Sequence, residues 1–212
     1  MPEVKGVGRV WDCCAAPGGK TLMLAARLNG AEILATDVSA KRLAKMQTRL
    51  RGFEYAEGVR CAVMDAAGGA AGPEGEFDLI LCDVPCSGTG TLARNPEIRH
   101  RLQPGELARQ AERQRTIVRC ALRRLAPGGR LVYSTCSLEA EENERVVEAV
   151  LAGEGLRRVG VDELLQKLVE KGWLRAEVAD RLRRSAVRDG ALRTLPGVHG
   201  CDGFYSYVAE RN

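Results

Sequence analysis

Residues 10–28 read VWDCCAAPGGKTLMLAARL and contain the change of pattern that decides the fold. The apolar run at 10–14 is too short for a typical helix, whereas 20–28 has the composition of one. Between them, Gly18 and Gly19 allow the backbone to turn tightly and to approach a ligand. The stretch therefore predicts a strand, a glycine loop and a helix in direct succession.

Further short apolar runs repeat the first half of this pattern. They lie at 32–37, 60–65, 77–83 and 130–136, and several of them end in aspartate. Helical stretches fill the gaps, and such alternation is typical of a mostly parallel sheet covered by helices on both faces. We therefore predict an α/β, Rossmann-like domain. One helix is expected over 39–51, capped by Ser39.

The second half of the chain is more helical. A long helix from about 104 to 125 is expected to end at the Pro-Gly-Gly of 127–129. A further helix at 139–153 is amphipathic, and two shorter ones predict a helical insertion over 161–188. Residues 202–210 alternate enough to form a closing, antiparallel edge strand.

The composition is that of a globular chain. The 212 residues contain no internal repeat, 28% are charged and 45% are hydrophobic, so we expect one domain over 1–212. No apolar run is long enough to span a bilayer, and the N-terminus lacks the order of a signal peptide. We expect a cytoplasmic protein, monomeric and without a membrane partner.

Eight cysteines and two histidines raise the question of metal binding. No CxxC occurs, and neither His100 nor His199 lies near a cysteine pair, so no metal site is predicted. A cytoplasmic chain has no reason to pair its thiols. Most of these cysteines are therefore expected to be small core residues.

The ends of the predicted strands point to a binding rim. In open α/β sheets, ligands bind outside the carboxyl ends of the strands. The five apolar runs end at Cys14, Asp37, Asp65, Asp83 and Cys136. If the predicted fold is correct, these five residues lie along one edge of the sheet.

The glycine loop favours a nucleoside cofactor. A phosphate-binding P-loop needs a glycine five residues before the glycine of its GK[ST], and here that position is Cys14. The loop also contains Pro17, and the dinucleotide pattern GxGxxG is absent. A cofactor without a long phosphate chain fits better, and S-adenosylmethionine (AdoMet) is the candidate. Asp37 could accept from its ribose hydroxyls and Asp65 from its adenine amino group.

Each aspartate alone is more often a helix cap or a loop residue. Three of them behind a glycine loop, at Asp37, Asp65 and Asp83, are harder to explain in that way. Two cysteine motifs follow the same kind of apolar run, DVPCSGTG at 83–90 and YSTCSLEAEEN at 133–143. Both cysteines stand beside small, turn-forming residues.

The motifs DCCAAPGGKT, DVPCSGTG and YSTCSLEAEEN, in this order and spacing, resemble the RNA cytosine-5 methyltransferases of the Fmu/Sun (RsmB-like) family. RNPEI at 94–98 and DGFY at 202–205 also look like motifs of that family. The resemblance covers nearly the whole chain. It implies a class I AdoMet-dependent methyltransferase fold and transfer of a methyl group to carbon 5 of a cytosine in RNA.

The chemistry explains the residue types. A thiolate that adds to carbon 6 of cytosine makes carbon 5 able to take a methyl group, and the free pKa of cysteine, roughly 8.5, can be lowered by its surroundings. Spacing does not tell which cysteine attacks, since a Pro-Cys motif carries the nucleophile in DNA cytosine methyltransferases. The resemblance implies Cys136 as nucleophile and Cys86 in product release. Asp83, if it is protonated or shares a proton, would activate the ring near nitrogen 3.

The resemblance also implies a cofactor site. Its expected residues are the segment Cys14, Ala15, Ala16, Pro17, Gly18, Gly19 and Lys20, together with Asp37, Arg42, Asp65 and Asp83. The family places Lys20 in the active site as well, although by itself it could be an ordinary residue of a first helical turn.

The segment 94–124 is strongly basic, with nine arginines against three glutamates. Such a segment is either a solvated helix face or a guanidinium surface for phosphates. The RNA interpretation favours the second, with ribosomal RNA expected and tRNA as an alternative. Aromatic residues make up only 4% of the chain, which does not indicate a stacking platform.

The family normally carries a long N-terminal extension with an RNA-binding module, whereas this chain begins about ten residues before its first predicted strand. Two alternatives to an active enzyme therefore stay open. One is a catalytically silent fragment that binds AdoMet or RNA. The other is an AdoMet enzyme acting on an amino group or a small molecule, which would need no cysteine pair.

Overall fold

A computed structural model describes residues 6–28, 30–68, 72–103, 105–152 and 154–212 of the chain. Within these residues, one sheet of nine strands has the order β3-β2-β1-β4-β5-β9-β8-β7, and β6 also pairs with β9. The five strands β1 to β5 pair with one another in parallel. They cover Arg9–Asp12, Glu32–Asp37, Val59–Val63, Phe77–Asp83 and Leu125–Thr135. The predicted fold class is confirmed.

The C-terminal strand β9 (Phe204–Arg211) is antiparallel to β5, as expected, but it is not an edge strand. Its other side pairs with β8 (Ala191–Thr194) and β6 (Leu156–Arg158). The edge is formed instead by β7 (Val187–Arg188), which pairs with β8. The prediction of an edge position was wrong because these two- to four-residue strands are too short to show a period.

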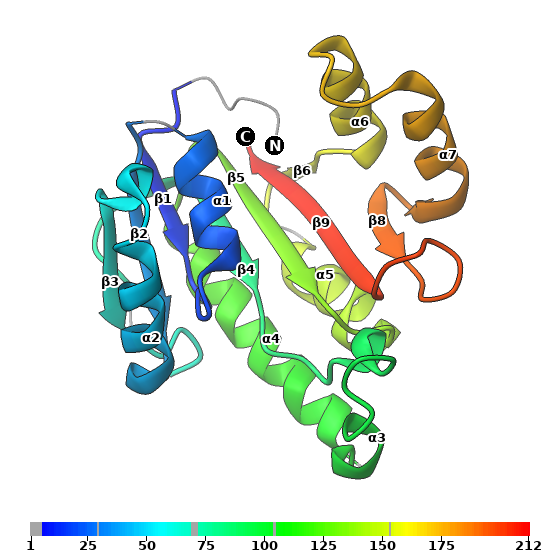
Figure 1. Ribbon diagram of the computed structural model, residues 1–212, viewed down its shortest axis with the longest axis horizontal. Coiled ribbons are helices and arrows are strands. Elements are labelled where there is room, and N and C mark those ends of the chain that lie inside the picture. The colour runs from blue at the N-terminus through cyan, green and yellow to red at the C-terminus, as the bar shows by residue number, and fades with distance from the viewer. Residues whose placement is uncertain (1–5, 29, 69–71, 104, 153) are drawn as a thin grey trace.

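Helices cover the two faces of the sheet separately (Figure 1). The helices α1 (Gly19–Arg27) and α2 (Ala40–Leu50) pack on one face, and α4 (Glu106–Leu122) and α5 (Glu144–Leu151) on the other. Along β4, successive side chains alternate between the two cores, since Leu79 and Leu81 belong to the first and Ile80 and Cys82 to the second. Ser39 caps α2 as predicted, accepting a hydrogen bond from the Arg42 amide.

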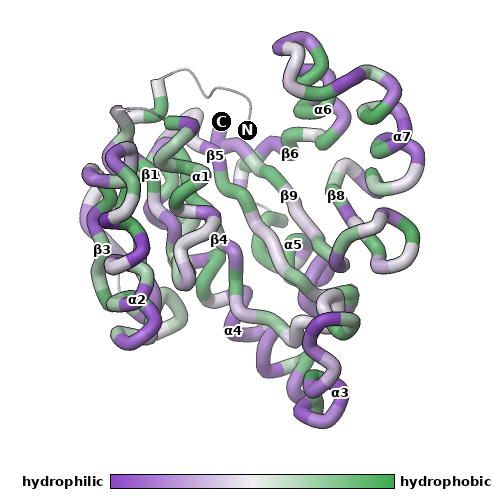
Figure 2. The backbone as a smooth tube through the Cα atoms, viewed as in Figure 1, coloured by the Kyte–Doolittle hydropathy of each residue, from purple (hydrophilic) through white to green (hydrophobic). Residues whose placement is uncertain are grey.

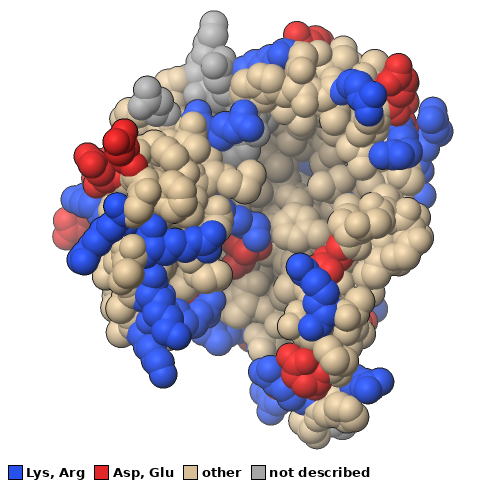
Figure 3. All heavy atoms as spheres, in the orientation of Figure 1, with Lys and Arg blue, Asp and Glu red and all other residues tan. Residues whose placement is uncertain are grey.

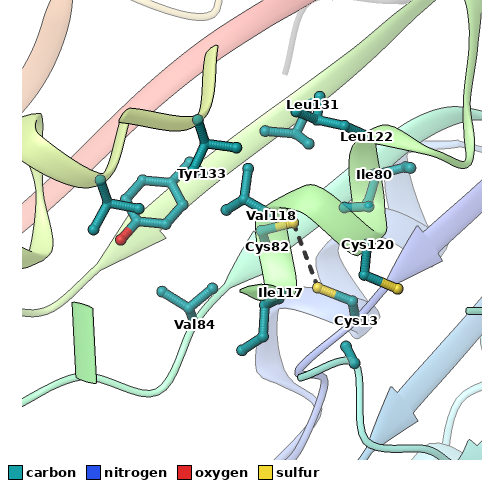
Figure 4. Close-up of a cluster of buried hydrophobic side chains, with 14 of the residues drawn as sticks. Cys13, Ile80, Cys82, Val84, Ile117, Val118, Cys120, Leu122, Leu131 and Tyr133 are labelled. Atoms are coloured by element: carbon teal, nitrogen blue, oxygen red, sulfur yellow. Dashed lines mark hydrogen bonds between the residues drawn. The ribbon is translucent and has the colours of Figure 1, made fainter. Parts of the chain in front are cut away.

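The second core contains the three cysteines that are fully buried, out of eight in the chain (Figure 4). Cys13 and Cys82 lie with their sulfur atoms 3.5 Å apart, and Cys120 of α4 is buried among the same side chains. These thiols are packing residues, as the composition predicted. Around them, α4 presents Ile117 and Val118 to the sheet.

The long helix ends earlier than expected. Helix α4 stops at Leu122, and Pro127, Gly128 and Gly129 lie inside β5, next to a shift of register between β4 and β5. A Cβ atom at position 129 would approach the carbonyl oxygen of Phe77 to 3.0 Å, so glycine is needed for the close contact between these strands. The Pro-Gly-Gly sequence therefore forms a bulge, and the prediction that it ends the helix was wrong; residue 104, the expected start, lies outside the described residues.

The segment after β5 is divided in two. A short 3-10 turn, η3 (Ala140–Glu142), precedes α5, and Asn143 separates them with φ −114° and ψ −100°. The expected continuous helix over 139–153 is thus interrupted. The side chain of Asn143 bonds to the loop that ends β5, which accounts for the break.

The expected helices of 161–188 are present as α6 (Val161–Glu170) and α7 (Ala176–Ala186). They share a small core of Val161, Leu165 and Ala179, and Figure 2 shows the alternation of hydrophobic and hydrophilic residues along them. That this segment is an insertion stays a prediction. Among the described residues, no helix has the length and hydropathy of a membrane span.

Candidate active site

The carboxyl ends of the parallel strands open onto one cavity of about 340 Å³. The five residues predicted to lie along one edge of the sheet all line this cavity. Three of them, Cys14, Asp65 and Cys136, lie one or two residues beyond the ends of their strands. The predicted site residues that line the cavity are Cys14, Ala16, Pro17, Asp37, Arg42, Asp65, Asp83, Cys86 and Cys136. The other four predicted site residues belong to the glycine loop and the start of the helix that follows it, but they are not part of the cavity wall; they are Ala15, Gly18, Gly19 and Lys20.

The glycine loop is held in shape by the neighbouring strand and helix. The amide of Ala15 donates to the carbonyl oxygen of Thr36 over 2.8 Å. Gly18 has φ +95°, and a Cβ atom there would lie 2.7 Å from the Cγ atom of Met46. Glycine is therefore required at 18 both for the backbone conformation and for the packing of α2. Gly19 then starts α1, whose first turn carries Lys20.

Asp37 fixes the loop from the end of β2. This carboxylate is 3% exposed, and it accepts hydrogen bonds from the amides of Ala16 (3.2 Å) and Ser39 (2.9 Å). Arg42 places a guanidinium nitrogen 3.7 Å from the same carboxylate and donates to the carbonyl oxygen of Ala16. Asp37 and Arg42 thus stabilise the cavity wall in addition to any contact with a ligand.

Asp65 lies across the cavity from the glycine loop, at the end of β3. Its Oδ1 atom accepts from the amide of Ala67 over 2.9 Å, which closes a turn. No hydrogen bond of Oδ2 to the described residues is present. This oxygen is available to accept from an amino group in the cavity.

The two predicted catalytic cysteines meet. Cys86, in the loop after β4, and Cys136, directly after β5, have their sulfur atoms 3.4 Å apart. The hydrogen bond from Cys86 lowers the pKa of Cys136. The same bond, together with burial, raises the pKa of Cys86. The geometry therefore favours a thiolate at Cys136 and a protonated thiol at Cys86.

Asp83 and Lys20 form an ion pair beside the thiols. The Nζ atom of Lys20 lies 2.6 Å from Oδ2 of Asp83, and 5.3 Å from the ring centroid of Phe204. The other oxygen, Oδ1, accepts from the hydroxyl of Ser134 over 2.7 Å. Both carboxylate oxygens of Asp83 are thus held in place by donors on neighbouring elements.

Two residues near the site were missed by the sequence analysis. Asp12 is 1% exposed at the end of β1, its Oδ2 accepts from the Thr21 hydroxyl, and burial raises its pKa to about 7. Arg113 of α4 lines the cavity and makes no ion pair with the described residues. Its position one helical turn before buried Ile117 could have indicated that it faces inward.

The basic segment 94–124 includes α3 (Ile98–Arg101) and the whole of α4. Its arginines on the outer face of α4 are mainly paired with glutamates, such as Arg115 with Glu112 over 3.1 Å. Arg99 and Arg101 of α3 make no ion pair with the described residues. In Figure 3, basic side chains gather over α2 and around α3, with a hollow between them.

The strand order, the glycine loop after β1 and the acidic ends of β2 and β3 fit AdoMet, since Asp37 is fixed at the cavity wall and Asp65 offers a free oxygen. This combination defines a class I AdoMet-dependent methyltransferase domain. No cluster of metal-binding side chains occurs in the part of the chain that the structure describes. AdoMet would be held by the wall formed by the glycine loop, Asp37 and Asp65.

The chain belongs to the family described as 16S rRNA methyltransferase RsmB/F, which matches residues 3–209. It is 34% identical over 203 residues to ribosomal RNA small subunit methyltransferase B of Vibrio cholerae, covering 95% of this chain and 41% of that protein. It is 32% identical over 206 residues to ribosomal RNA small subunit methyltransferase F of Serratia proteamaculans, covering 93% and 39%. The chain thus spans about two fifths of the length of these relatives.

A solved structure supports the cofactor assignment. NSun6 from Pyrococcus horikoshii, solved with the AdoMet analogue SFG, superimposes with a TM-score of 0.74 at 28% identity. The match covers 95% of this chain and 47% of that protein. The resemblance found in the sequence motifs is confirmed at the level of the family, the fold and the cofactor.

Proposed function

We propose that this chain methylates carbon 5 of a cytosine in RNA, with AdoMet as methyl donor and Cys136 as covalent nucleophile. The observation that carries the proposal is the pair of sulfur atoms 3.4 Å apart, next to the ion pair of Lys20 and Asp83, in the predicted cofactor cavity. Methyl transfer to an oxygen or to an amino nitrogen would need neither thiol. The geometry therefore favours attack on a pyrimidine ring.

The first step is addition of the Cys136 thiolate to carbon 6 of cytosine. This residue is suited to the step because the hydrogen bond from Cys86 lowers its pKa. The ammonium group of Lys20 donates to Asp83, and a proton passed through this pair can be held at ring nitrogen 3, where the ring must be activated. Carbon 5 then has enamine character. When bound, AdoMet supplies an electrophilic methyl group.

Release requires that a base, in the simplest case water from solvent, takes the carbon 5 proton. The electrons of that C–H bond form the double bond between carbons 5 and 6, and the bond between carbon 6 and sulfur breaks. The electron pair of that bond returns to the sulfur of Cys136. Cys86 lies within hydrogen-bond reach of this sulfur, so its S–H group can stabilise the departing thiolate. We assign Cys86 to this step.

We propose ribosomal RNA as the substrate, because the two relatives described above are named small-subunit ribosomal RNA methyltransferases. A second cavity of about 350 Å³ opens on the side of Cys86 that faces α3, and Arg101 lines it. A guanidinium in this place is suited to a phosphate beside a flipped-out cytosine. Transfer RNA, which offers the same groups, is the alternative substrate.

The test uses the Cys86→Ala variant, incubated with AdoMet and small-subunit ribosomal RNA. Loss of the release step should leave a protein–RNA adduct that survives denaturing electrophoresis. Adding Cys136→Ala to this variant should abolish the band. Adding Cys201→Ala, which removes an exposed thiol outside the site, should leave the band unchanged.

A band that persists in the Cys86→Ala, Cys136→Ala double variant would refute Cys136 as nucleophile. Methyl transfer by Cys136→Ala alone would also refute Cys136 as nucleophile. Methyl transfer by the double variant, which lacks both thiols of the site, would refute covalent catalysis and would favour an AdoMet enzyme of another kind. A wild-type protein that binds AdoMet but transfers no methyl group to ribosomal or transfer RNA would refute the proposed activity.

A further inference from the structure

One buried turn contacts both cysteine loops. Glu142, the last residue of η3, and Asn143, which follows it, have no exposed surface. The Glu142 carboxylate accepts from the amide of Ser87 over 2.9 Å and from its hydroxyl. The Asn143 side chain accepts from the Thr135 hydroxyl over 2.6 Å and donates to the carbonyl oxygen of Ser137 over 3.0 Å. Adjacent residues thus hold the chain next to Cys86 and on both sides of Cys136.

The other side of Cys86 is tied to the same turn through α4. Gln114, also fully buried, donates from Nε2 to the carbonyl oxygen of Pro85 over 2.9 Å and to Oε1 of Glu142 over 3.0 Å. The hydroxyl of Tyr133 donates to the carbonyl oxygen of Glu142. Each cysteine is therefore flanked by two residues that are bonded to this network.

Neither Glu142 nor Asn143 lines the cavity that contains the two thiols, so neither is placed to touch a substrate. Burial of a carboxylate is unfavourable unless donors surround it, and the donors of Glu142 are Ser87 and Gln114. The result of this network is a fixed relation between two loops that lie about fifty residues apart in the sequence.

We propose that Glu142 and Asn143 are positioning residues that set the distance and orientation between the sulfur atoms of Cys86 and Cys136. The catalytic consequence, that the release thiol is held against the nucleophile, rests on the proposed function. The structural claim does not, because it concerns two thiols that are present in the free protein.

The experiment measures the rate at which dibromobimane crosslinks Cys86 to Cys136. Each sulfur displaces one bromide and forms one thioether bond, and two protons are released. Peptide mass spectrometry identifies the crosslinked pair, and the Cys86→Ala, Cys136→Ala double variant gives the background. Crosslinking depends on the separation of the thiols and needs neither RNA nor AdoMet.

Two substitutions at one position separate geometry from charge. Glu142→Gln keeps an oxygen for Ser87 and Gln114 and should crosslink within about twofold of the wild type. Glu142→Ala removes every side-chain contact and should slow crosslinking at least tenfold. Glu141→Ala is the matched control, because Glu141 lies on the same turn and, among the residues that the structure describes, its one ion pair is with Arg145.

Charge alone predicts the opposite result. Four causes raise the pKa of Cys86: the hydrogen bond to Cys136, burial, the charge of Cys136 and, last, the carboxylate of Glu142. The other titratable or charged groups around Cys86 are Asp83, Lys20, Tyr133 and Arg113, and on the side that faces α3 Arg101 and Glu106. Because removal of one negative charge makes the thiol easier to ionise, a purely electrostatic role would make both Glu142 variants crosslink faster.

A folded Glu142→Ala protein that crosslinks at the wild-type rate would overturn the proposal. If this variant fails to fold, Thr135→Val decides, since it removes the hydroxyl that donates to Asn143 and accepts from the Ser137 amide. Crosslinking should fall at least threefold, and an unchanged rate overturns the proposal. The wild type and its variants can crosslink at the expected rates even when the wild type methylates no RNA. In that case the proposed function fails and the positioning role stands.

Discussion

The buried carboxyl group of Asp12 should make the stability of the domain depend on pH in a range where ordinary carboxylates do not titrate. Asp12 lies under the first turn of α1, and its Oδ2 atom accepts from the Thr21 hydroxyl over 2.6 Å. Burial is the main cause that raises its pKa from 3.8 to about 7, and the charge of Asp83 adds to it. The folded protein therefore binds a proton that the unfolded chain releases.

The sign and the size follow from this difference. The contribution of Asp12 is fully present below pH 3.8 and is lost as the pH rises through about 7. Each pH unit between these values costs about 1.4 kcal/mol, so the whole effect is at most roughly 4 kcal/mol. Between pH 5 and pH 8 the free energy of unfolding should fall by about 2 to 3 kcal/mol from this group alone.

Asp12→Asn removes the titration and keeps an oxygen for Thr21. Urea unfolding at pH 5, 6, 7 and 8, with all thiols reduced, should give wild-type and variant stabilities that diverge as the pH rises, in favour of the variant. Asp162→Asn, which changes an exposed carboxylate on α6, is the control and should run parallel to the wild type. Parallel curves for Asp12→Asn, within about 0.5 kcal/mol, would refute the argument from burial.

Three further predictions concern the site itself. Asp37→Asn should weaken AdoMet binding about 10- to 100-fold in calorimetry, because a charged acceptor is lost at the cavity wall, and an unchanged affinity would contradict its cofactor role. Lys20→Met should lower the rate of methyl transfer in a single turnover by about 10²- to 10⁴-fold, with AdoMet affinity within about threefold; a wild-type rate would exclude a proton role for the Lys20–Asp83 pair. Arg101→Ala should weaken RNA binding and reduce the slope of log K against log salt by about 1, while Arg184→Ala, on α7, should leave both unchanged.

The central part of the fold could be predicted because its signals are local. The five parallel strands are short apolar runs, and α1 and α2 follow glycine or serine signals that act on adjacent residues. The error at Pro-Gly-Gly has a different origin. The same three residues that would stop a helix in isolation form a bulge here, because Gly129 has to pass close to Phe77 of the next strand. That contact is absent from the local sequence.

The candidate site also contains residues that local sequence signals reveal and residues that depend on contacts distant in the sequence. The residues of the three motifs reach one cavity because each motif directly follows a strand, so the order of the strands brings them together. Glu142 could not be singled out, since its partner Ser87 is 55 residues away and its neighbours Glu141 and Glu144 are partly exposed carboxylates that pair with arginines. Asp12 was missed for the related reason that its pKa depends on burial, which a sequence does not show.

The meeting of the two cysteines follows from the pairing of β4 with β5. These strands are parallel neighbours, and Asp83 lies opposite Ser134 in their register. The pairing of β4 with β5 therefore ends at the same level in both strands, three residues before Cys86 and two residues before Cys136. Two motifs about fifty residues apart in the sequence therefore lie side by side at the carboxyl ends of the strands.

The same pairing explains why the basic segment and the cysteines occur together. Parallel neighbours require a crossover over one face of the sheet, and here the crossover is α3 and α4. Its start carries Arg101 to the cavity beside Cys86, its middle places Arg113 in the cofactor cavity, and Gln114 fixes Pro85. The element that the topology demands therefore also supplies the surface that we propose for RNA, part of the wall of the cavity that we propose for the cofactor, and the support of Cys86. A substitution that shifts α4 should accordingly impair RNA binding, AdoMet binding and thiol crosslinking together, whereas one confined to α3 should affect RNA binding alone.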